Sequence, residues 1–362
     1  MKILLVTGSI NQGGAEFQLL ALADLLQRRG MDIEVLALTD HSHYLPYIKE
    51  KNIRYSCISN KGNNFQRILR SVKAIRKAKP ALVISYIRAT SLVAILSKMA
   101  SFFRFKLIIS ERTALILPRY DLLYFNLALS ANAVTVNSKS KVSYINKRFP
   151  YLKKRIFFIP NIINFDKFRN IEKVNSNSSE VRISYVGRIS PEKNLLNLVR
   201  AIDAVERKGY KISLSLHGAA NNKRYHEEMM LLIKELQLEN TVQYKGPTND
   251  VGEVYKNTDL LCLVSIFEGF SNVVSEAISS GVPVLASDIE ENRFLVEDGI
   301  NGFLADPGSY ESIAAGIEKF LRLTDAQKSV ISANNKAKAQ ALFDEEKIYR
   351  QYLGIFKQIG VS

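Results

Sequence analysis

The sequence repeatedly alternates short apolar runs with amphipathic segments of helical spacing. In the first half, apolar runs of strand length fall at residues 3–7, 33–38, 82–85, 106–110 and 133–136. Segments 15–29 and 64–78, with apolar residues three or four positions apart, lie between some of these runs. Because parallel strands need a crossover of about a dozen residues or more, usually a helix, this order predicts βαβ units and a parallel sheet.

The alternation restarts near residue 181, after a polar, Ser- and Asn-rich segment at 170–180 that is typical of an exposed connection. The predicted elements of this half are strands at 181–186, 212–217, 242–245, 260–264 and 282–286, helices at 194–207, 224–236 and 272–280, and a mostly helical end from 311 to 358.

Two domains fit a chain of 362 residues of which 47% are hydrophobic. We therefore predict an α/β fold of two Rossmann-like, doubly wound parallel-sheet domains, residues 1–163 and 164–344, facing each other across a cleft. Helix 345–362 is expected to pack back on the first domain. No membrane-spanning helix is expected, because the most apolar stretch, 92–109, is interrupted by three cations. The two cysteines, Cys57 and Cys262, show no disulfide or zinc spacing.

The segment from Glu268 to Glu276 carries the clearest chemical signal. Its two carboxylates stand eight positions apart, on a loop after a predicted strand and in a predicted helix that Ser271 or Asn272 can cap. Free N–H groups at a helix N-terminus bind phosphate, and carboxylates accept hydrogen bonds from sugar hydroxyls. The alternative is an ordinary helix start, since acidic residues are common in a first helical turn.

Arg188 and Lys193 form a second candidate, five positions apart in a loop that begins at Gly187 and enters a helix. Arg binds phosphate through two parallel hydrogen bonds and Lys adds a point charge, so both suit a diphosphate that leaves during a reaction. A solvated pair of cations is the alternative, but the helix dipole disfavours cations at a helix start.

A third segment, Gly13-Gly14-Ala15-Glu16, follows the first predicted strand. Its paired glycines let backbone approach a ligand closely, although the spacing is not that of the dinucleotide fingerprint G-x-G-x-x-G.

Together these segments resemble the glycosyltransferase family 4 pattern on the GT-B fold. Further matching stretches lie at 159–161, where the family has its interdomain crossover, and at 281–288 and 298–304. The matches occur in the family's order over nearly the whole chain.

The resemblance implies that residues 1–163 bind the acceptor and residues 164–344 the nucleotide-sugar donor. Arg188 and Lys193 would hold the donor diphosphate, Glu276 the ribose hydroxyls, and Glu268 the transferred sugar. The implied donor-binding residues are Gly14, Gly187, Arg188, Lys193, Gly269, Phe270, Ser271, Asn272 and Glu276. The family retains the anomeric configuration by a front-face reaction. It needs no metal or other cofactor, because the cations that correspond to Arg188 and Lys193 take the place of a metal ion.

Residues 109–113 depart from the family pattern, since many members carry a His there and this chain reads Ile-Ser-Glu-Arg-Thr. Ser-Glu-Arg resembles a subgroup that builds bacterial surface polysaccharides. Glu111, a catalytic candidate beside Glu268, Arg188 and Lys193, and Arg112 either position sugar or acceptor or form a buried structural pair. Weaker acceptor candidates are Gly13 and Glu16.

The net positive charge of the chain comes from its first half. Residues 1–163 hold 26 Lys and Arg against 8 Asp and Glu, whereas the remainder holds 24 against 27. Segment 61–79 has seven basic and no acidic residues, with apolar residues at helical spacing, and segment 98–106 mixes cations with Phe102, Phe103 and Phe105. Both segments suit an anionic membrane surface. For the three Phe residues, the alternative that they lie in the hydrophobic core is slightly favoured. Nucleic acid is not expected as a partner, because no RNA- or DNA-binding module signature is present.

The resemblance therefore implies a metal-independent, retaining hexosyltransferase with a nucleotide-diphosphate donor, a UDP-sugar. The acceptor would be a saccharide or a polyprenyl-diphosphate-linked sugar in the synthesis of bacterial surface polysaccharide, lipopolysaccharide or capsule. The enzyme would be cytoplasmic and peripherally bound to the inner face of the cell membrane. The alternatives are a nucleotide-sugar epimerase or hydrolase on the same fold, or a degenerate sugar-nucleotide-binding subunit.

Overall fold

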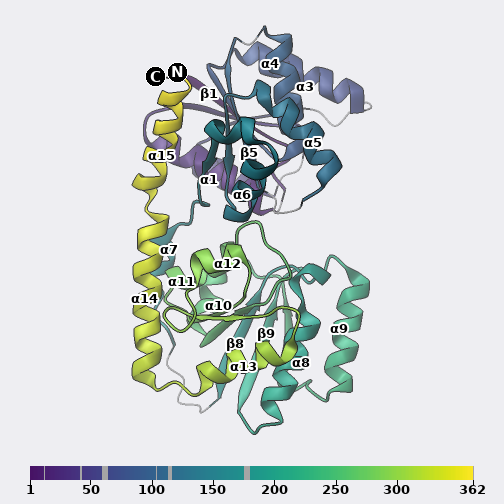
Figure 1. Cartoon of the computed structure of the whole chain (residues 1–362), viewed down its shortest axis with the longest axis vertical. Coiled ribbons are helices and arrows are strands. Elements are labelled where there is room, and N and C mark those ends of the chain that lie inside the picture. The colour runs from purple at the N-terminus through teal and green to yellow at the C-terminus, as the bar shows by residue number, and fades with distance from the viewer. Residues whose placement is uncertain are drawn as a thin grey trace. The chain divides into compact units, whose positions relative to one another are not determined.

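The computed structural model describes residues 1–11, 13–40, 43–58, 64–102, 104–112, 116–174 and 180–361. They form two compact units, Met1–Ile162 together with the C-terminal segment from Asp344, and Ile163–Phe343 (Figure 1). Each unit contains one all-parallel sheet with helices on both faces. The predicted fold class, two Rossmann-like parallel-sheet domains, is confirmed.

The first unit is built on a seven-stranded sheet in the order β3-β2-β1-β4-β5-β6-β7. Its strands are β1 (Lys2–Thr7), β2 (Asp32–Ala37), β3 (Arg54–Cys57), β4 (Leu82–Tyr86), β5 (Lys106–Glu111), β6 (Ala133–Val136) and β7 (Ile156–Phe158). Its helices are α1 (Gly14–Arg28), α2 (Leu45–Glu50), α3 (Asn64–Ala78), α4 (Arg88–Ala100), α5 (Pro118–Leu127), α6 (Lys139–Arg148) and α15 (Glu345–Gln358), with 3-10 turns η1 (Ala128–Ser130) and η2 (Pro150–Arg155).

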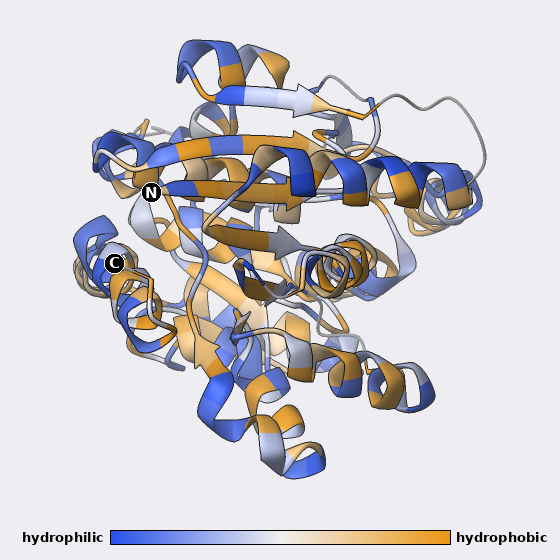
Figure 2. Cartoon of the chain, turned by 90° about the horizontal axis from the view of Figure 1, so that it is seen from above, coloured by the Kyte–Doolittle hydropathy of each residue, from blue (hydrophilic) through white to orange (hydrophobic). Residues whose placement is uncertain are grey.

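Alternation along the strands builds two cores in this unit. On β1, Ile3 and Leu5 join the core beneath α1 and α15, whereas Leu4 and Val6 join the core beneath α3, α4 and α5. Successive strand residues point to opposite faces, so a sheet covered on both faces needs these nearly continuous apolar runs. In Figure 2 the β1 ribbon is accordingly mostly hydrophobic, whereas the helices alternate.

The second unit is built on a six-stranded sheet in the order β10-β9-β8-β11-β12-β13. Its strands are β8 (Val181–Val186), β9 (Ile212–His217), β10 (Val242–Gly246), β11 (Leu260–Leu263), β12 (Val284–Ser287) and β13 (Phe303–Ala305). Its helices are α7 (Phe165–Arg169), α8 (Leu195–Glu206), α9 (Lys223–Glu235), α10 (Val251–Lys256), α11 (Asn272–Ser279), α12 (Glu290–Leu295), α13 (Tyr310–Leu321) and α14 (Asp325–Phe343), with the 3-10 turn η3 (Pro191–Lys193).

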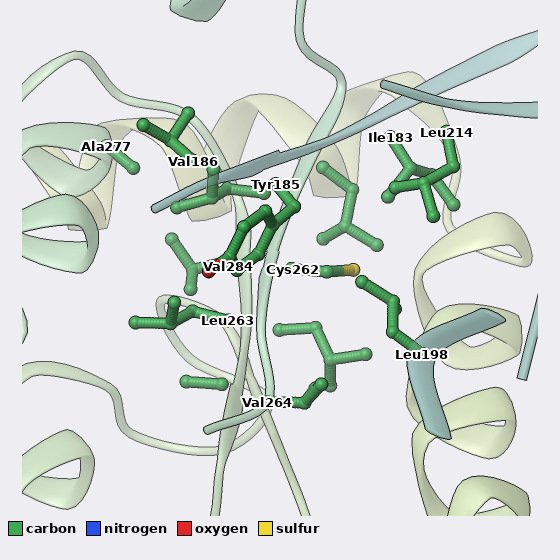
Figure 3. Packing of buried hydrophobic residues seen from close by; sticks show 14 of the residues in the cluster. Ile183, Tyr185, Val186, Leu198, Leu214, Cys262, Leu263, Val264, Ala277 and Val284 are labelled. Carbon is green, nitrogen blue, oxygen red and sulfur yellow. The ribbon is translucent and has the colours of Figure 1, made fainter. Parts of the chain in front are cut away.

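The core of the second unit surrounds the neighbouring parallel strands β8 and β11 and includes residues of helices α8 and α11. Tyr185, Cys262 and Leu198, contributed by β8, β11 and α8, meet there and are fully buried (Figure 3). Tyr185 also donates its hydroxyl to the Arg188 carbonyl oxygen at 2.7 Å. The core therefore fixes the loop that leaves β8.

Each sheet reverses its strand order at one point, between β1 and β4 in the first unit and between β8 and β11 in the second. The loops after these two strands run to opposite sides of a parallel sheet and leave a crevice beyond the strand ends, where such folds bind ligands. In the second unit the loops at this point are those that contain Arg188 and Glu268.

Candidate functional site

Lys193 and Glu268 meet at the strand-order reversal of the second unit. The Nζ atom of Lys193 lies 2.6 Å from Oε1 of Glu268, and the two side chains are only 15% and 12% exposed. The structure thus brings together two motifs that stand 75 positions apart in the sequence. They converge because β8 and β11 are neighbours, so that their following loops leave the same edge of the sheet.

The loop after β8 is held by glycine and by Asn194. Gly187 and Gly218 both have positive φ, and a Cβ atom on Gly218 would lie 1.7 Å from the Gly187 carbonyl oxygen. Only glycine permits this backbone approach. Asn194, also at positive φ, donates its side-chain amide to the carbonyl oxygens of Val264 and Pro307. It thereby fixes Lys193 against the end of β11, a role that the sequence reasoning missed.

Arg188 is far more exposed than Lys193. Its side chain is 66% exposed, and its guanidinium lies 3.5 Å from the carboxylate of Glu192, four positions further along the loop. Exposed pairs of this kind contribute little free energy. Arg188 can therefore turn toward an anion at low cost, while Lys193 is already in place.

The loop 268–271 leads into α11, whose N-cap is Ser271. We expected a side-chain cap from Ser271 or Asn272, and this was wrong for Ser271: its hydroxyl donates to Oδ1 of Asn292 at 2.6 Å. The Phe270 ring packs against Phe294 in the core. Those two side chains thus anchor the loop, and the first turn of α11 keeps N–H groups that the helix itself does not use.

Glu276 lies on the second turn of α11 and is half-buried. The hydroxyl of Tyr255 donates to Oε2 of Glu276 at 3.1 Å. Burial raises the pKa of Glu276 to about 7, and the hydrogen bond from Tyr255 opposes part of that increase. A carboxyl group with this environment readily exchanges solvent for hydroxyl donors of a ligand.

Gly13, Gly14 and Glu16 lie together at the start of α1 in the first unit. Gly13 is the N-cap, and the Glu16 carboxylate folds back so closely that a Cβ atom on Gly13 would lie 2.1 Å from its Oε2. Burial raises the pKa of Glu16. The involvement of these residues in phosphate or acceptor binding stays a prediction.

Glu111 and Arg112 do not pair with each other, so the alternative of a structural pair between these two residues does not hold, and their positioning of sugar or acceptor stays a prediction. Glu111 is 1% exposed and accepts from Nε of Arg88 at 2.8 Å, while Arg88 also donates to Asp121. Arg112, the first residue after β5, turns away from this cluster, and its guanidinium donates to the hydroxyl of Tyr86 at 3.0 Å, in the core beneath α1 and α15. Its guanidinium donates to Oδ1 of Asn161, in the crossover segment, at 2.9 Å.

The segment with mixed aromatic and basic residues splits between core and surface. Phe105 is 4% exposed, as the core interpretation expected, but Phe102 is 82% exposed, and Phe103 lies outside the described residues. Lys98 is buried and donates to the Ser130 carbonyl oxygen, and burial lowers its pKa to about 8. Lys98 therefore does not belong to a basic surface.

Within the described ranges, no group of three or more His, Cys, Asp or Glu side chains is arranged to hold a metal ion. None of the described helices combines the length and the apolar character that crossing a membrane requires.

Two family models match this chain. The model described as Glycosyltransferase Family 4 matches residues 12–167, and the model described as Glycosyl transferases group 1 matches residues 166–337. The chain belongs to the family 4 glycosyltransferases. The border between the two matches falls close to the division between the two units at Ile162 and Ile163.

Curated relatives of this family 4 chain include bacterial glycosyltransferases. It is 24% identical, over 99% of both chains, to an α-1,4-N-acetyl-D-galactosaminyltransferase of Campylobacter jejuni. The full name of that relative includes a saccharide linked to undecaprenol through a diphosphate. The chain is 22% identical to the amylovoran biosynthesis glycosyltransferase AmsD of Erwinia amylovora, over 91% of this chain and 93% of the relative. It matches the capsular polysaccharide glycosyltransferase CapM of Staphylococcus aureus at 29% identity, over less than half, 46%, of that relative's length.

Solved structures show the same fold along the whole chain. Anabaena HepE in complex with UDP and glucose superimposes with a TM-score of 0.85 at 22% identity, over 99% of both chains. TarM superimposes with a TM-score of 0.83 at 13% identity, over 98% of both chains. These likenesses confirm the GT-B fold of the family 4 glycosyltransferases.

Proposed function

We propose that this glycosyltransferase uses a nucleoside-diphosphate sugar, a UDP-sugar, and retains the anomeric configuration without a bound metal. The observation that supports the proposal most is the Lys193–Glu268 pair, fixed at the ligand-binding edge of the second sheet with Arg188 beside it. The likeness to Anabaena HepE, which was solved with UDP and with UDP-glucose, supports a UDP donor.

In this proposal the Lys193–Glu268 pair separates its charges when the donor binds. Lys193 turns its ammonium group to the diphosphate, and Arg188 swings in from solvent to bind the same group. Fixed cations stabilise the negative charge that develops on the leaving diphosphate, which is the work that a metal does in other enzymes. Glu268, released from Lys193, accepts hydrogen bonds from hydroxyls of the transferred sugar, assisted by the backbone of Gly269–Ser271.

Glu276 is proposed to accept the two ribose hydroxyls. Its carboxyl group lies on the same loop–helix segment as Glu268, and Tyr255 holds one of its oxygens in place. The reaction is a front-face displacement, in which the leaving phosphate helps take the acceptor's proton. We place Glu111 outside the reacting groups, because its carboxylate is covered and bonded to Arg88. It acts as a positioning residue of the first unit.

We further propose that the acceptor is a saccharide or a polyprenyl-diphosphate-linked sugar in bacterial surface-polysaccharide synthesis. The relative from Campylobacter jejuni and the polysaccharide-synthesising relatives support this class of acceptor. A lipid-linked acceptor places the enzyme on the inner face of the cell membrane, and the excess of cations in the first unit favours that location.

The test is transfer and slow donor hydrolysis with a panel of UDP- and GDP-sugars. One donor is expected to react. Lys193→Ala is expected to lower turnover about 100- to 1000-fold, because enzymes lose that much when one group that stabilises charge in the transition state is removed. Glu276→Ala is also expected to abolish transfer. Lys234→Ala and Glu235→Ala, on the exposed end of α9, are the matched controls. Normal turnover by Lys193→Ala would contradict the assignment. An epimerised donor would favour the epimerase alternative, and binding without turnover would favour the degenerate subunit.

A further inference from the structure

Helices α3, α4 and α5 leave an unusual number of apolar side chains exposed. Among the described residues, 23 large hydrophobic side chains are exposed, and 13 of them lie between Phe65 and Leu129. The 13 residues are Phe65, Ile68, Leu69, Leu96, Met99, Phe102, Ile116, Leu117, Tyr120, Leu122, Leu123, Leu127 and Leu129. Exposed hydrophobic residues are ordinarily scattered, so a cluster of this size marks an interaction surface.

Nine of these residues lie on helices α3, α4 and α5, and the other four, Phe102, Ile116, Leu117 and Leu129, lie within two residues of α4 or α5. Helices α3, α4 and α5 contribute Ile75, Val93 and Phe125 to the same core, on one face of the sheet. Helix α4 packs against both α3 and α5 (Figure 1). The inner sides of the three helices are therefore used by the core, and their outer sides form one surface, called here the α3–α5 face.

The α3–α5 face has no carboxylate to neutralise its cations. Between Glu50 and Asp166 the sequence contains 22 Lys and Arg but only two acidic residues, Glu111 and Asp121. Those two are 1% and 0% exposed and are bonded to Arg88 inside the unit. The face is thus apolar and positively charged at once.

A groove of about 1010 Å³ runs along this face between α3 and the residues that follow α4. Its lining combines apolar residues with five cations and includes no acidic residue: Leu69, Val72, Lys73, Ile75, Arg76, Lys77, Lys79, Pro80, Ser101, Phe102, Arg104 and Phe105. No described carboxylate forms an ion pair with any of the five cations.

Phe102 stands at the rim of the groove in a strained conformation. Its φ is 52°, in the left-handed region that a bulky residue rarely adopts, and its side chain is 82% exposed. Neither feature helps the fold, because Asn or Gly would suit this backbone better and the ring makes little use of the core. Strain of this kind is typical of a functional position.

We infer that the α3–α5 face docks the first unit on an anionic lipid bilayer, with Phe102 entering the boundary between headgroups and acyl chains. Cations around the groove lie over the lipid phosphates, and the outer apolar side chains of α3, α4 and α5 leave water and contact lipid. This deepens the proposed function by naming the surface that brings the enzyme to a lipid-linked acceptor.

The composition of the face distinguishes a membrane from other partners. A nucleic-acid backbone would use the cations but would leave the apolar side chains of α4 and α5 in water. A second copy of this chain would bring two uncompensated positive surfaces together. An anionic bilayer matches both properties, since amphipathic interfacial surfaces combine cations with buried apolar area.

The test is cosedimentation of the full chain with vesicles of phosphatidylglycerol and phosphatidylcholine in equal parts, and with pure phosphatidylcholine vesicles. Wild type is expected to bind the anionic vesicles, less strongly as salt rises. Phe102→Asn, which suits the positive φ, is expected to weaken binding about tenfold. The double variant Lys73→Gln, Arg76→Gln is expected to weaken it about twentyfold and to reduce the salt dependence. Leu231→Asn and Lys234→Gln, on exposed positions of α9, are the matched controls.

Equal binding of wild type to both kinds of vesicle, or unchanged binding by both test variants, would overturn the inference. So would an equally large loss in the α9 controls. Melting temperatures with and without UDP are measured on the same samples. UDP stabilisation that persists in Phe102→Asn while vesicle binding falls separates the docking face from the donor site. Vesicle binding without any UDP effect would leave the docking face in place and reject the proposed donor.

Discussion

Glu276 gives the sharpest prediction about stability, because burial raises the pKa of its carboxyl group from 4.5 to about 7. Below pH 4.5 the group is protonated in both folded and unfolded chains. As pH rises from 4.5 to 7, the unfolded chain ionises first, so the folded state loses stability, and the loss is complete above pH 7. At about 1.4 kcal/mol for each pKa unit, the loss approaches about 3 kcal/mol, an upper value since the side chain is only half-buried.

The Glu276→Gln variant removes this titration and keeps the acceptor oxygen for Tyr255. The difference in unfolding free energy between wild type and variant should therefore shift by about 3 kcal/mol toward the variant between pH 4.5 and 8. For a unit of this size about 2 kcal/mol per M is a reasonable urea dependence, so the midpoints should shift by about 1.5 M relative to each other.

Urea unfolding followed by far-UV circular dichroism from pH 4.5 to 8 measures this shift, and comparing midpoints avoids assuming that the two units unfold together. Glu235→Gln, an exposed position on the same unit, is the control and should follow wild type. If wild type and Glu276→Gln show parallel pH dependences, Glu276 is not the buried titrating group described here.

Three further changes test how the site residues are held. Gly218→Ala places a Cβ atom against the Gly187 carbonyl, so it should lower both the melting temperature and the affinity for UDP, whereas a wild-type melting curve would contradict the close approach. Glu111→Gln should lower stability by about 3 kcal/mol, since it leaves Arg88 buried with one charged partner fewer, and the folded fraction should still turn over; full stability with lost turnover would restore Glu111 to a catalytic role. Arg112→Ala should lower the melting temperature by several degrees through the loss of its hydrogen bonds, which differential scanning calorimetry would detect.

The repeated pattern of buried runs predicted the central strands of both sheets because such strands are apolar on both faces. Three of the four edge strands of the two described sheets, β3, β7 and β13, were not predicted, whereas the edge strand β10 was predicted at 242–245. β3 reads Arg-Tyr-Ser-Cys with no buried residue, and β7 and β13 have only three residues each. A short strand that pairs on one side carries too little apolar sequence to stand out.

The main segment of the first unit ends at Ile162, and the polar segment 170–180 does not separate the two units. The polar segment follows α7, which belongs to the second unit, and residues 175–179 lie outside the described part of the chain. The stretch 159–161, which resembles the family's interdomain crossover, lies directly before this division. A composition change marks an exposed loop, which need not separate two cores.

Local motifs predicted the donor segment, whereas the environment of the acceptor residues depends on distant contacts. Lys193 and Glu268 were both named as candidates because each lies in a recognisable strand–loop–helix transition. Arg112 donates to the hydroxyl of nearby Ser110. Other partners of Glu111 and Arg112, namely Arg88, Tyr86 and Tyr352, are 23 to 240 positions away along the chain, and no local pattern encodes them. Their contacts show that these two neighbours turn to opposite faces of the sheet, Glu111 toward Arg88 of α4 and Arg112 toward Tyr352 of α15.

The central claim is that the edge of the second sheet between β8 and β11 binds a nucleoside diphosphate. Titration calorimetry of UDP into wild type, Lys193→Ala and the control Lys234→Ala tests it without any need for an acceptor. We predict that wild type and control bind UDP equally, and that Lys193→Ala, with its fold verified by circular dichroism, binds at least about tenfold more weakly. Equal affinity for UDP in Lys193→Ala and wild type would contradict the claim.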